Sequence, residues 1–157
     1  MGITETKIES LGVKLPKPTK PVANYVPFKR VGSLLFVSGQ LPFGLDGKIA
    51  AASIGKLGSD SGVEAASEAA RLCAINVIAQ AKAAVGELDR ISQVVRLGGF
   101  FNVNATFGLL TSAMNGASDL MVAVFGERGL HARTAAGAAY LPFDALAEVE
   151  AIFEITA

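Results

Sequence analysis

Residues 147–155 alternate strictly between two sets of side chains, and this alternation constrains the fold more than any other feature. One set comprises Ala147, Val149, Ala151, Phe153 and Ile155, and the other comprises Glu148, Glu150, Ile152 and Glu154. A period of two is that of a β-strand, in which successive side chains point to opposite faces. The segment therefore predicts a strand that packs one face against a core and leaves carboxylates on the other face.

Three more strands are predicted from short apolar runs. They cover residues 33–37, 91–101 and 134–141, and a turn at residues 142–144 separates the third from the strand over 147–155. Strands that alternate with helices along a chain favour a mixed sheet.

Two helices are predicted from apolar residues at helical spacing. The first begins at Ser61, which has capping-box spacing to Glu64, and ends at Gly86. The second begins between Asn115 and Ser118 and ends at Gly126. The predicted fold class is therefore α+β, in the order β-α-β-α-β-β, with both helices on one face of a mixed sheet.

A length of 157 residues suits one domain. Pro16, Pro18 and Pro21 alternate with Lys and Thr, so residues 1–24 are expected to form an extended N-terminal arm, and residues 25–157 the domain itself. Hydrophobic residues make up 51% of the chain and charged residues 18%, below the usual share of about 25%. An Ala- and Gly-rich sequence would explain this, but we favour apolar surface that is buried against sister subunits.

Charge and cysteine content argue against several classes of protein. Lys and Arg together number 14, as do Asp and Glu, so no net field favours nucleic acid or an anionic membrane. The lone Cys73 cannot form an internal disulfide and lies in a helical pattern, which favours a buried structural role. No apolar run reaches 18 residues, so a cytoplasmic location is the default expectation.

Metal, triad and nucleotide chemistry have little support in the sequence. One His and one Cys cannot build a zinc site, and no Walker A or G-x-G-x-x-G motif is present. A Ser-His-Asp triad would have to use His131, and no G-x-S-x-G elbow supplies a nucleophile beside it. We therefore expect no cofactor and no metal.

The candidate site residues are polar groups beside predicted strands. Arg133 directly precedes the apolar strand, and its planar fork suits a carboxylate, either of a ligand or of a strand glutamate. Glu148 and Glu150 share a strand face, where they form either a solvated edge or a site for proton transfer. Tyr25 is either a packing aromatic or a ring over a ligand, and Ser38 either caps a turn or binds a ligand oxygen.

Together these residues resemble the YjgF/RidA family, also labelled endoribonuclease L-PSP or chorismate-mutase-like. Tyr25-Val26, followed by Ser38-Gly39-Gln40-Leu41-Pro42, is similar to the opening strands of that family. Ala132-Arg133-Thr134 resembles its Pro-Ala-Arg-Ser signature, and Leu141-Pro142 and Glu148-Val149-Glu150 follow at the family's spacing.

The resemblance implies a homotrimer around a β-barrel-like core, with clefts between subunits. It implies hydrolysis of reactive 2-imino or enamine acids to 2-oxo acids and ammonia, without a cofactor. Arg133 would then clamp the substrate carboxylate, and Glu148 would orient the attacking water. The substrate would also contact Tyr25, Ser38, Thr134, the backbone of Ala135, and a residue between Asn115 and Ser118, for which we take Ser118.

Two departures from the family pattern concern residues near the expected ligand and leave the expected fold unchanged. His131 replaces the usual proline before Ala-Arg, and Ala135 replaces the usual cysteine. The alternative function is a non-catalytic trimeric protein that binds small carboxylates. The ribonuclease activity in the family label is disfavoured by zero net charge and by only two tyrosines and no tryptophan.

Overall fold

The computed structural model describes residues 2–105 and 107–157. Its helices are α1 (Ile3–Ser10), α2 (Val63–Val85) and α3 (Leu110–Phe125). Its strands are β1 (Phe28–Val31), β2 (Leu34–Gln40), β3 (Ile91–Asn102), β4 (Ala132–Ala138) and β5 (Ala147–Ile155). Single-turn 3-10 helices lie at Ala51–Ser53, Leu88–Arg90, Gly126–Gly129 and Pro142–Asp144.

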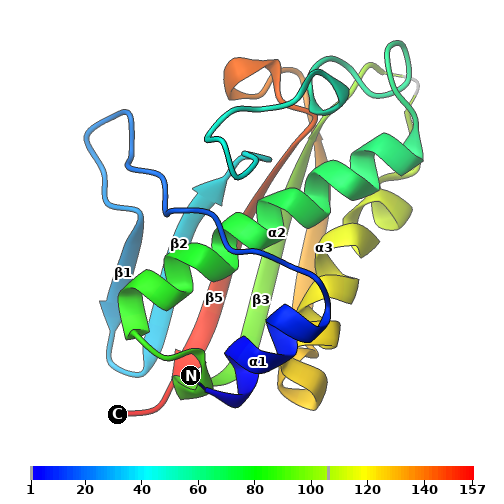
Figure 1. Ribbon diagram of the computed structural model, residues 1–157. Helices are drawn as coiled ribbons and strands as arrows, with labels where there is room; N and C mark the ends of the chain where they lie inside the picture. Colours follow the sequence, from blue (N-terminus) through cyan, green and yellow to red (C-terminus); the bar gives the residue numbers. More distant parts are fainter. Residues whose placement is uncertain (1, 106) are drawn as a thin grey trace.

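The five strands form one mixed sheet in the order β1-β2-β5-β3-β4 (Figure 1). β3 and β4 are parallel, and the other neighbours are antiparallel. β5, the last strand in the sequence, thus lies at the centre of the sheet, while β1 and β4 form its two edges. This order brings residues near the start and the end of the chain into one layer.

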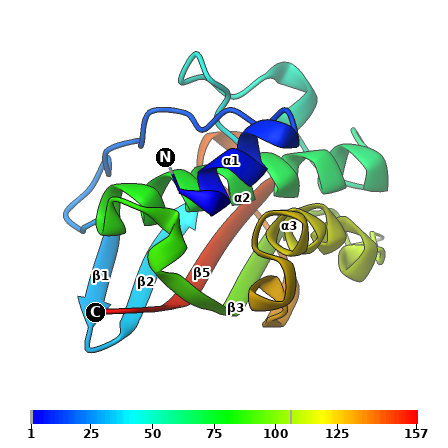
Figure 2. The same cartoon turned by 60° about the horizontal axis from the view of Figure 1, so that its bottom comes forward.

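All three helices lie on the same side of the sheet, as Figure 2 shows. α2 runs across the middle strands and packs against α3, and the core between the helices and the sheet includes Ile78, Leu97, Phe101 and Phe153. The predicted alternation in β5 is confirmed, because its odd-numbered residues are buried and its even-numbered residues are not. The other face of the sheet is left uncovered by helices, which confirms the predicted α+β class with helices on one face.

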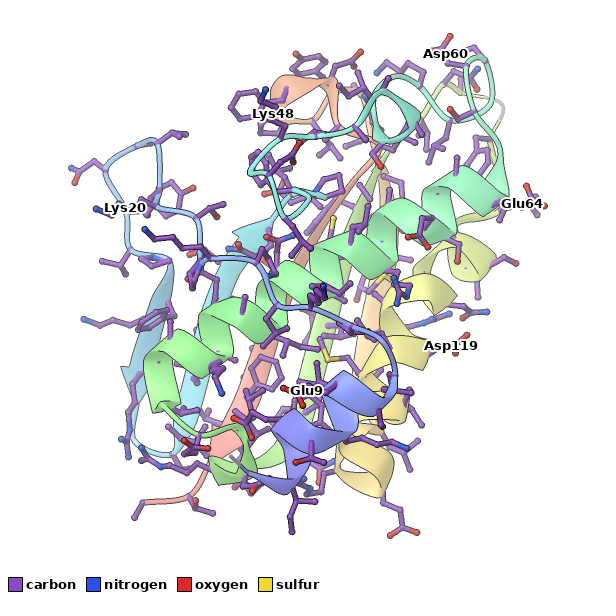
Figure 3. The ribbon with its side chains drawn as sticks, in the orientation of Figure 1. Glu9, Lys20, Lys48, Asp60, Glu64 and Asp119 are labelled. Carbon is purple, nitrogen blue, oxygen red and sulfur yellow. The ribbon has the colours of Figure 1, made fainter. Side chains whose placement is uncertain are left out.

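The N-terminal segment differs from the prediction, because residues 3–10 form α1 instead of an extended arm. The backbone amides of Ile3 and Thr4 donate to the Asp89 carboxylate at 2.7 and 2.8 Å, which caps the helix from 85 residues away in the sequence. Ile8 is buried in the core. A segment without helix or strand follows α1 and includes Lys20, in the part of the chain that leads to β1 (Figure 3). The division of the chain at residue 24 remains a prediction.

Three predicted boundaries also need correction. α2 begins at Val63 after Gly62 without a side-chain cap, so the predicted capping box at Ser61 does not form. The backbone amide of Ser61 instead donates to the carbonyl of Lys56 in the preceding loop. α3 begins at Leu110, at least five residues before the predicted start, and β4 already includes Arg133. The structure also adds β1, which pairs with β2 and was not among the predicted strands.

Candidate functional site

Arg133 lies on the edge strand β4 with its side chain on the helix side of the sheet. It is in register with Leu97 on β3, which in turn pairs with Ala151 on β5, and both of these are buried under the helices. Paired residues in a sheet point to the same face, so Arg133 reaches toward α3. Its position within the strand fixes the direction in which the guanidinium leaves the backbone.

Three acceptors from α3 hold the guanidinium. Nη1 donates to Oδ1 of Asn115 at 2.8 Å and to Oγ of Ser118 at 3.0 Å, and Nη2 donates to the carbonyl of Thr111 at 3.0 Å. A guanidinium has five N–H donors, so these bonds leave Nε–H and one Nη2–H, and Nε and Nη2 are the two nitrogens of one edge of the group. That remaining edge has the geometry for bidentate binding of a carboxylate.

No carboxylate pairs with Arg133 within the described ranges, 2–105 and 107–157. The ion pair with a strand glutamate, which was one reading of the sequence, is formed by another arginine: Arg96 Nη1 lies 3.5 Å from Oε1 of Glu150. The positive charge of Arg133 is thus held by neutral groups. This leaves the charge of Arg133 to be balanced by a ligand or by solvent.

His131 continues the same network. Its Nε2 lies 2.9 Å from Oγ of Ser118, and its Nδ1 lies 2.6 Å from the carbonyl oxygen of Gly129. A polar chain therefore runs from Arg133 through Ser118 to His131. The absence of a G-x-S-x-G elbow had suggested that His131 has no serine beside it, and the fold brings Ser118 to that place.

Glu148 lies on β5, on the uncovered face of the sheet. It is in register with Phe100, and its carboxylate lies against the backbone of Gly39, where any side chain would overlap it. Burial raises the pKa of the Glu148 carboxyl above its ordinary value, and the nearby charge of Glu150 raises it further. Glu148 therefore holds a proton more readily than an exposed glutamate does.

Thr134 and Ala135 follow Arg133 and point to opposite faces. Thr134 is in register with Gly98 and Glu150 on the uncovered face, where its Oγ1 accepts a hydrogen bond of 3.1 Å from Arg96. Ala135 shares the helix side with Arg133, since both have buried partners on β3. The side chain of Thr134 therefore does not lie beside the guanidinium of its own chain.

Tyr25 and Ser38 belong to the other edge of the sheet. The Ser38 hydroxyl donates to the carbonyl of Val26 at 2.8 Å, which ties the segment containing Tyr25 to β2. The exposed Tyr25 lines a cavity of about 450 Å³. Gly39, whose backbone lies against the Glu148 carboxylate, lines the same cavity. Phe143, whose backbone has a left-handed φ of 59°, also lines this cavity.

One chain thus holds two separate groups of candidate residues. The arginine group comprises Arg133, Asn115, Ser118 and His131 on the helix side of the β4 edge. The glutamate group comprises Glu148, Gly39, Ser38 and Tyr25 near β2 and β5. β3 lies between β4 and β5, and Arg133 and Glu148 point to opposite faces. The sheet therefore separates the side chains of Arg133 and Glu148 within one chain.

Sequence reasoning missed several members of these groups. It left the α3 residue open between Asn115 and Ser118, and both ends of that interval bind Arg133 because they are three residues apart on one helix face. It gave no role to Arg96 or to the Thr111 carbonyl, which no motif marks. The contact between Gly39 and the Glu148 carboxylate depends on the pairing of β2 with β5, and a single glycine in the sequence does not predict that pairing.

Among residues 2–105 and 107–157, no group of three or more His, Cys, Asp or Glu side chains could hold a metal ion. No helix in this part of the chain is long and apolar enough to cross a membrane.

The fold is an α+β domain with helices on one face of a five-stranded sheet, and Arg133 lies on an edge strand of that sheet. The model of the family described as "YjgF/chorismate_mutase-like, putative endoribonuclease" matches residues 5–155, and the chain belongs to this family. Protein TCP17 of Trypanosoma cruzi is 43% identical over 98% of this chain and 95% of its own length.

Two crystal structures are similar over nearly the whole chain. Atu1372 of Agrobacterium tumefaciens, a protein of unknown function, is 47% identical with a TM-score of 0.90, over 98% of this chain and 92% of its own. A "putative endoribonuclease" of Shewanella oneidensis is 38% identical with a TM-score of 0.93, over 98% and 100%. The predicted family is confirmed by these matches.

Proposed function

We propose that this protein is a cofactor-independent deaminase that hydrolyses 2-imino or enamine acids to 2-oxo acids and ammonia. The observation that carries the proposal is the guanidinium of Arg133, which is fixed by three neutral acceptors and keeps a two-donor edge free. A 2-imino acid carries a carboxylate next to its reactive carbon. Binding the carboxylate at this edge would hold the imine carbon at a defined distance from the protein.

Glu148 is the candidate for the proton transfers. Water adds to the imine carbon and gives one proton to the Glu148 carboxylate, which passes it to the nitrogen. The C–N bond then breaks, the second proton of the water moves to the departing nitrogen, and the C–O bond becomes a carbonyl, which releases ammonia. The raised pKa of Glu148 favours this role, because a carboxyl whose pKa is closer to neutrality both accepts and returns a proton readily. An imine is already electrophilic, so positioning and proton transfer suffice.

The separation of the arginine and glutamate groups supports a site shared between subunits of a homotrimer. The face of the sheet that helices leave uncovered carries Phe36 and Phe100, each more than one third exposed, which fits burial against sister subunits. Escherichia coli TdcF, which has the same fold at a TM-score of 0.61 and 20% identity, was crystallised with bound serine. A small molecule with a carboxylate is thus a known ligand of that protein.

The test is ammonia release from freshly generated 2-iminopropionate and from longer imino acids. We expect faster release than in buffer, loss of the acceleration in Arg133→Ala, and little change in Arg30→Ala, a control on exposed β1. An intact protein that matches buffer across the panel of imines would contradict the proposal.

Binding without turnover is the second candidate function. The clamp around Arg133 is complete within one chain, whereas Glu148 belongs to the other group. Thermal stabilisation by 2-oxo acids, lost in Arg133→Ala and accompanied by no ammonia release, would favour this reading.

A further inference from the structure

The polar chain behind Arg133 has a defined direction. Nδ1 of His131 faces the Gly129 carbonyl, which can only accept, so Nδ1 carries the proton. Nε2 of the neutral ring is then an acceptor and takes the hydroxyl proton of Ser118. The Ser118 oxygen is left with its lone pairs toward Nη1 of Arg133, which always donates. One assignment of the protons on Arg133, Ser118 and His131 therefore satisfies all of these hydrogen bonds.

The backbone around His131 is fixed by contacts that hold this direction. A side chain at the buried Gly129 would overlap the carbonyl of Met121, so the close approach to α3 needs glycine here. The Leu130 carbonyl accepts a hydrogen bond of 2.9 Å from the Gln93 side chain on β3. The Gly129 carbonyl, and with it the tautomer of His131, is therefore set by packing.

We propose that His131 is a positioning residue for the carboxylate clamp. Nε2 of His131 accepts a hydrogen bond from the Ser118 hydroxyl, and this turns the lone pairs of the Ser118 oxygen toward Arg133. Nη1 is then anchored between Ser118 and Asn115, and the Nε–Nη2 edge of Arg133 faces the ligand. The proposal rests on the proposed function for its substrate, but the clamp can also be tested by ligand binding alone.

Neutral partners suit this role better than a carboxylate would. A carboxylate at position 131 or 118 would pair with the guanidinium and compete with the ligand. Asp119, the acidic residue next to Ser118, is exposed and points outward from α3 (Figure 3). The chain from His131 thus fixes the orientation of Arg133 and leaves its charge available.

The first test reads the tautomer of His131 by NMR. His131 is the only histidine in the sequence, so its ring nitrogens can be assigned without ambiguity in the full-length protein. Above the pH at which imidazole titrates, long-range ¹H–¹⁵N spectra should show the proton on Nδ1 and an unprotonated Nε2. A proton on Nε2 would overturn the proposal, because Ser118 would then have to accept from both sides.

The second test is a double-mutant cycle read by pyruvate binding, and by KM and kcat where turnover is found. His131→Phe keeps a ring without an acceptor, and Ser118→Ala removes the link to Arg133. We expect each to weaken pyruvate binding, or raise KM, by about tenfold, with kcat within about twofold of the unmodified protein. His131→Gln, which can place an oxygen near the Nε2 position, should restore most of the affinity.

The combined variant distinguishes a chain from two independent effects. If His131 acts through Ser118, the double variant should bind pyruvate no more weakly than Ser118→Ala alone. Additive losses, or failure of His131→Gln to recover affinity while its Tm is unchanged, would overturn the proposal. Failure of deaminase activity alone would leave the NMR and binding results as the test of the clamp.

Ser118 and His131 also have the geometry of a nucleophile and its base. In the positioning role the Ser118 oxygen is held by Arg133, so a fluorophosphonate should not label it. Covalent labelling of Ser118 that is lost in His131→Phe would show a nucleophile and overturn the proposal.

Discussion

The surroundings of the charged side chain differ between the arginine group and the glutamate group. Around Arg133, neutral acceptors from α3 hold a guanidinium that cannot lose its proton, and they leave its charge uncompensated. Around Glu148, burial and the charge of Glu150 favour the protonated form of a carboxyl that can change its state. The contacts of Arg133 fix its orientation, and the surroundings of Glu148 change its proton affinity, a difference that suits the proposed imine hydrolysis.

The largest expected effect comes from mixing two variants, one that lacks Arg133 and one that lacks Glu148, so that each chain keeps only one of the two groups. Arg133→Ala and Glu148→Gln should each be inactive. Hybrid trimers formed by co-refolding equal amounts of the two variants should regain about a quarter of the unmodified activity. A shared cleft receives an intact Arg133 from one subunit in half of the cases and an intact Glu148 from the neighbouring subunit in half of the cases. Ammonia release by the mixture measures this. Activity no higher than that of the separate variants would show that the groups do not meet across subunits.

Gly116→Ala should disturb the arginine group through α3. A Cβ at Gly116 would overlap the carbonyl of Ser67 on α2, so the helices that present Asn115 and Ser118 would have to separate. We expect a loss of about 2 kcal/mol in the free energy of unfolding, measured by urea denaturation at fixed protein concentration. Gly108→Ala is the control, because a methyl group there meets no atom within 4 Å. Equal stability of the two variants would show that the close approach of α2 and α3 does not matter.

Glu150→Gln should change the pKa of Glu148 and leave the hydrogen bonds of Arg133 unchanged. The charge of Glu150 contributes to the raised pKa of Glu148, so its removal lowers that pKa and keeps Glu148 ionised to lower pH. The acid limb of kcat/KM should therefore move to lower pH, whereas pyruvate binding to Arg133 stays unchanged. Glu154→Gln, at an exposed position on the same face of β5, is the matched control. An acid limb that stays in place would mean that Glu148 is not the group that titrates.

The smallest effect concerns stability. Because the pKa of Glu148 is raised in the folded protein, ionisation destabilises the fold as the pH rises through that pKa, and the penalty is absent below the ordinary value of 4.5. Glu148→Gln should therefore raise Tm at pH 8 by on the order of 1 °C and leave it unchanged at pH 4. Calorimetry at both values checks this; a lower Tm at pH 8 would contradict the burial argument.

The sequence predicted elements whose signals are local. The bounds of β5 follow from alternation alone, and Gly86 ends α2 at a left-handed φ of 80° as expected. α1 was missed because its cap, Asp89, comes from a distant part of the chain. Arg133 and Glu148 were singled out by their places beside predicted strands together with the resemblance to the family, and their roles remain predictions. Their placement on opposite faces could not be predicted, because it depends on the strand order, which is set by long-range pairing.

The central position of β5 has a consequence for how the protein is made. Until β5 leaves the ribosome, β2 and β3 have no shared neighbour, and each exposes an edge of unpaired backbone amides and carbonyls. The sheet can therefore close only after β5 has been synthesised, and folding must join strands that are far apart in sequence, which is slow. β5, which carries Glu148, is also the strand that completes the sheet, so a nascent chain acquires its fold and the environment of Glu148 in the same step.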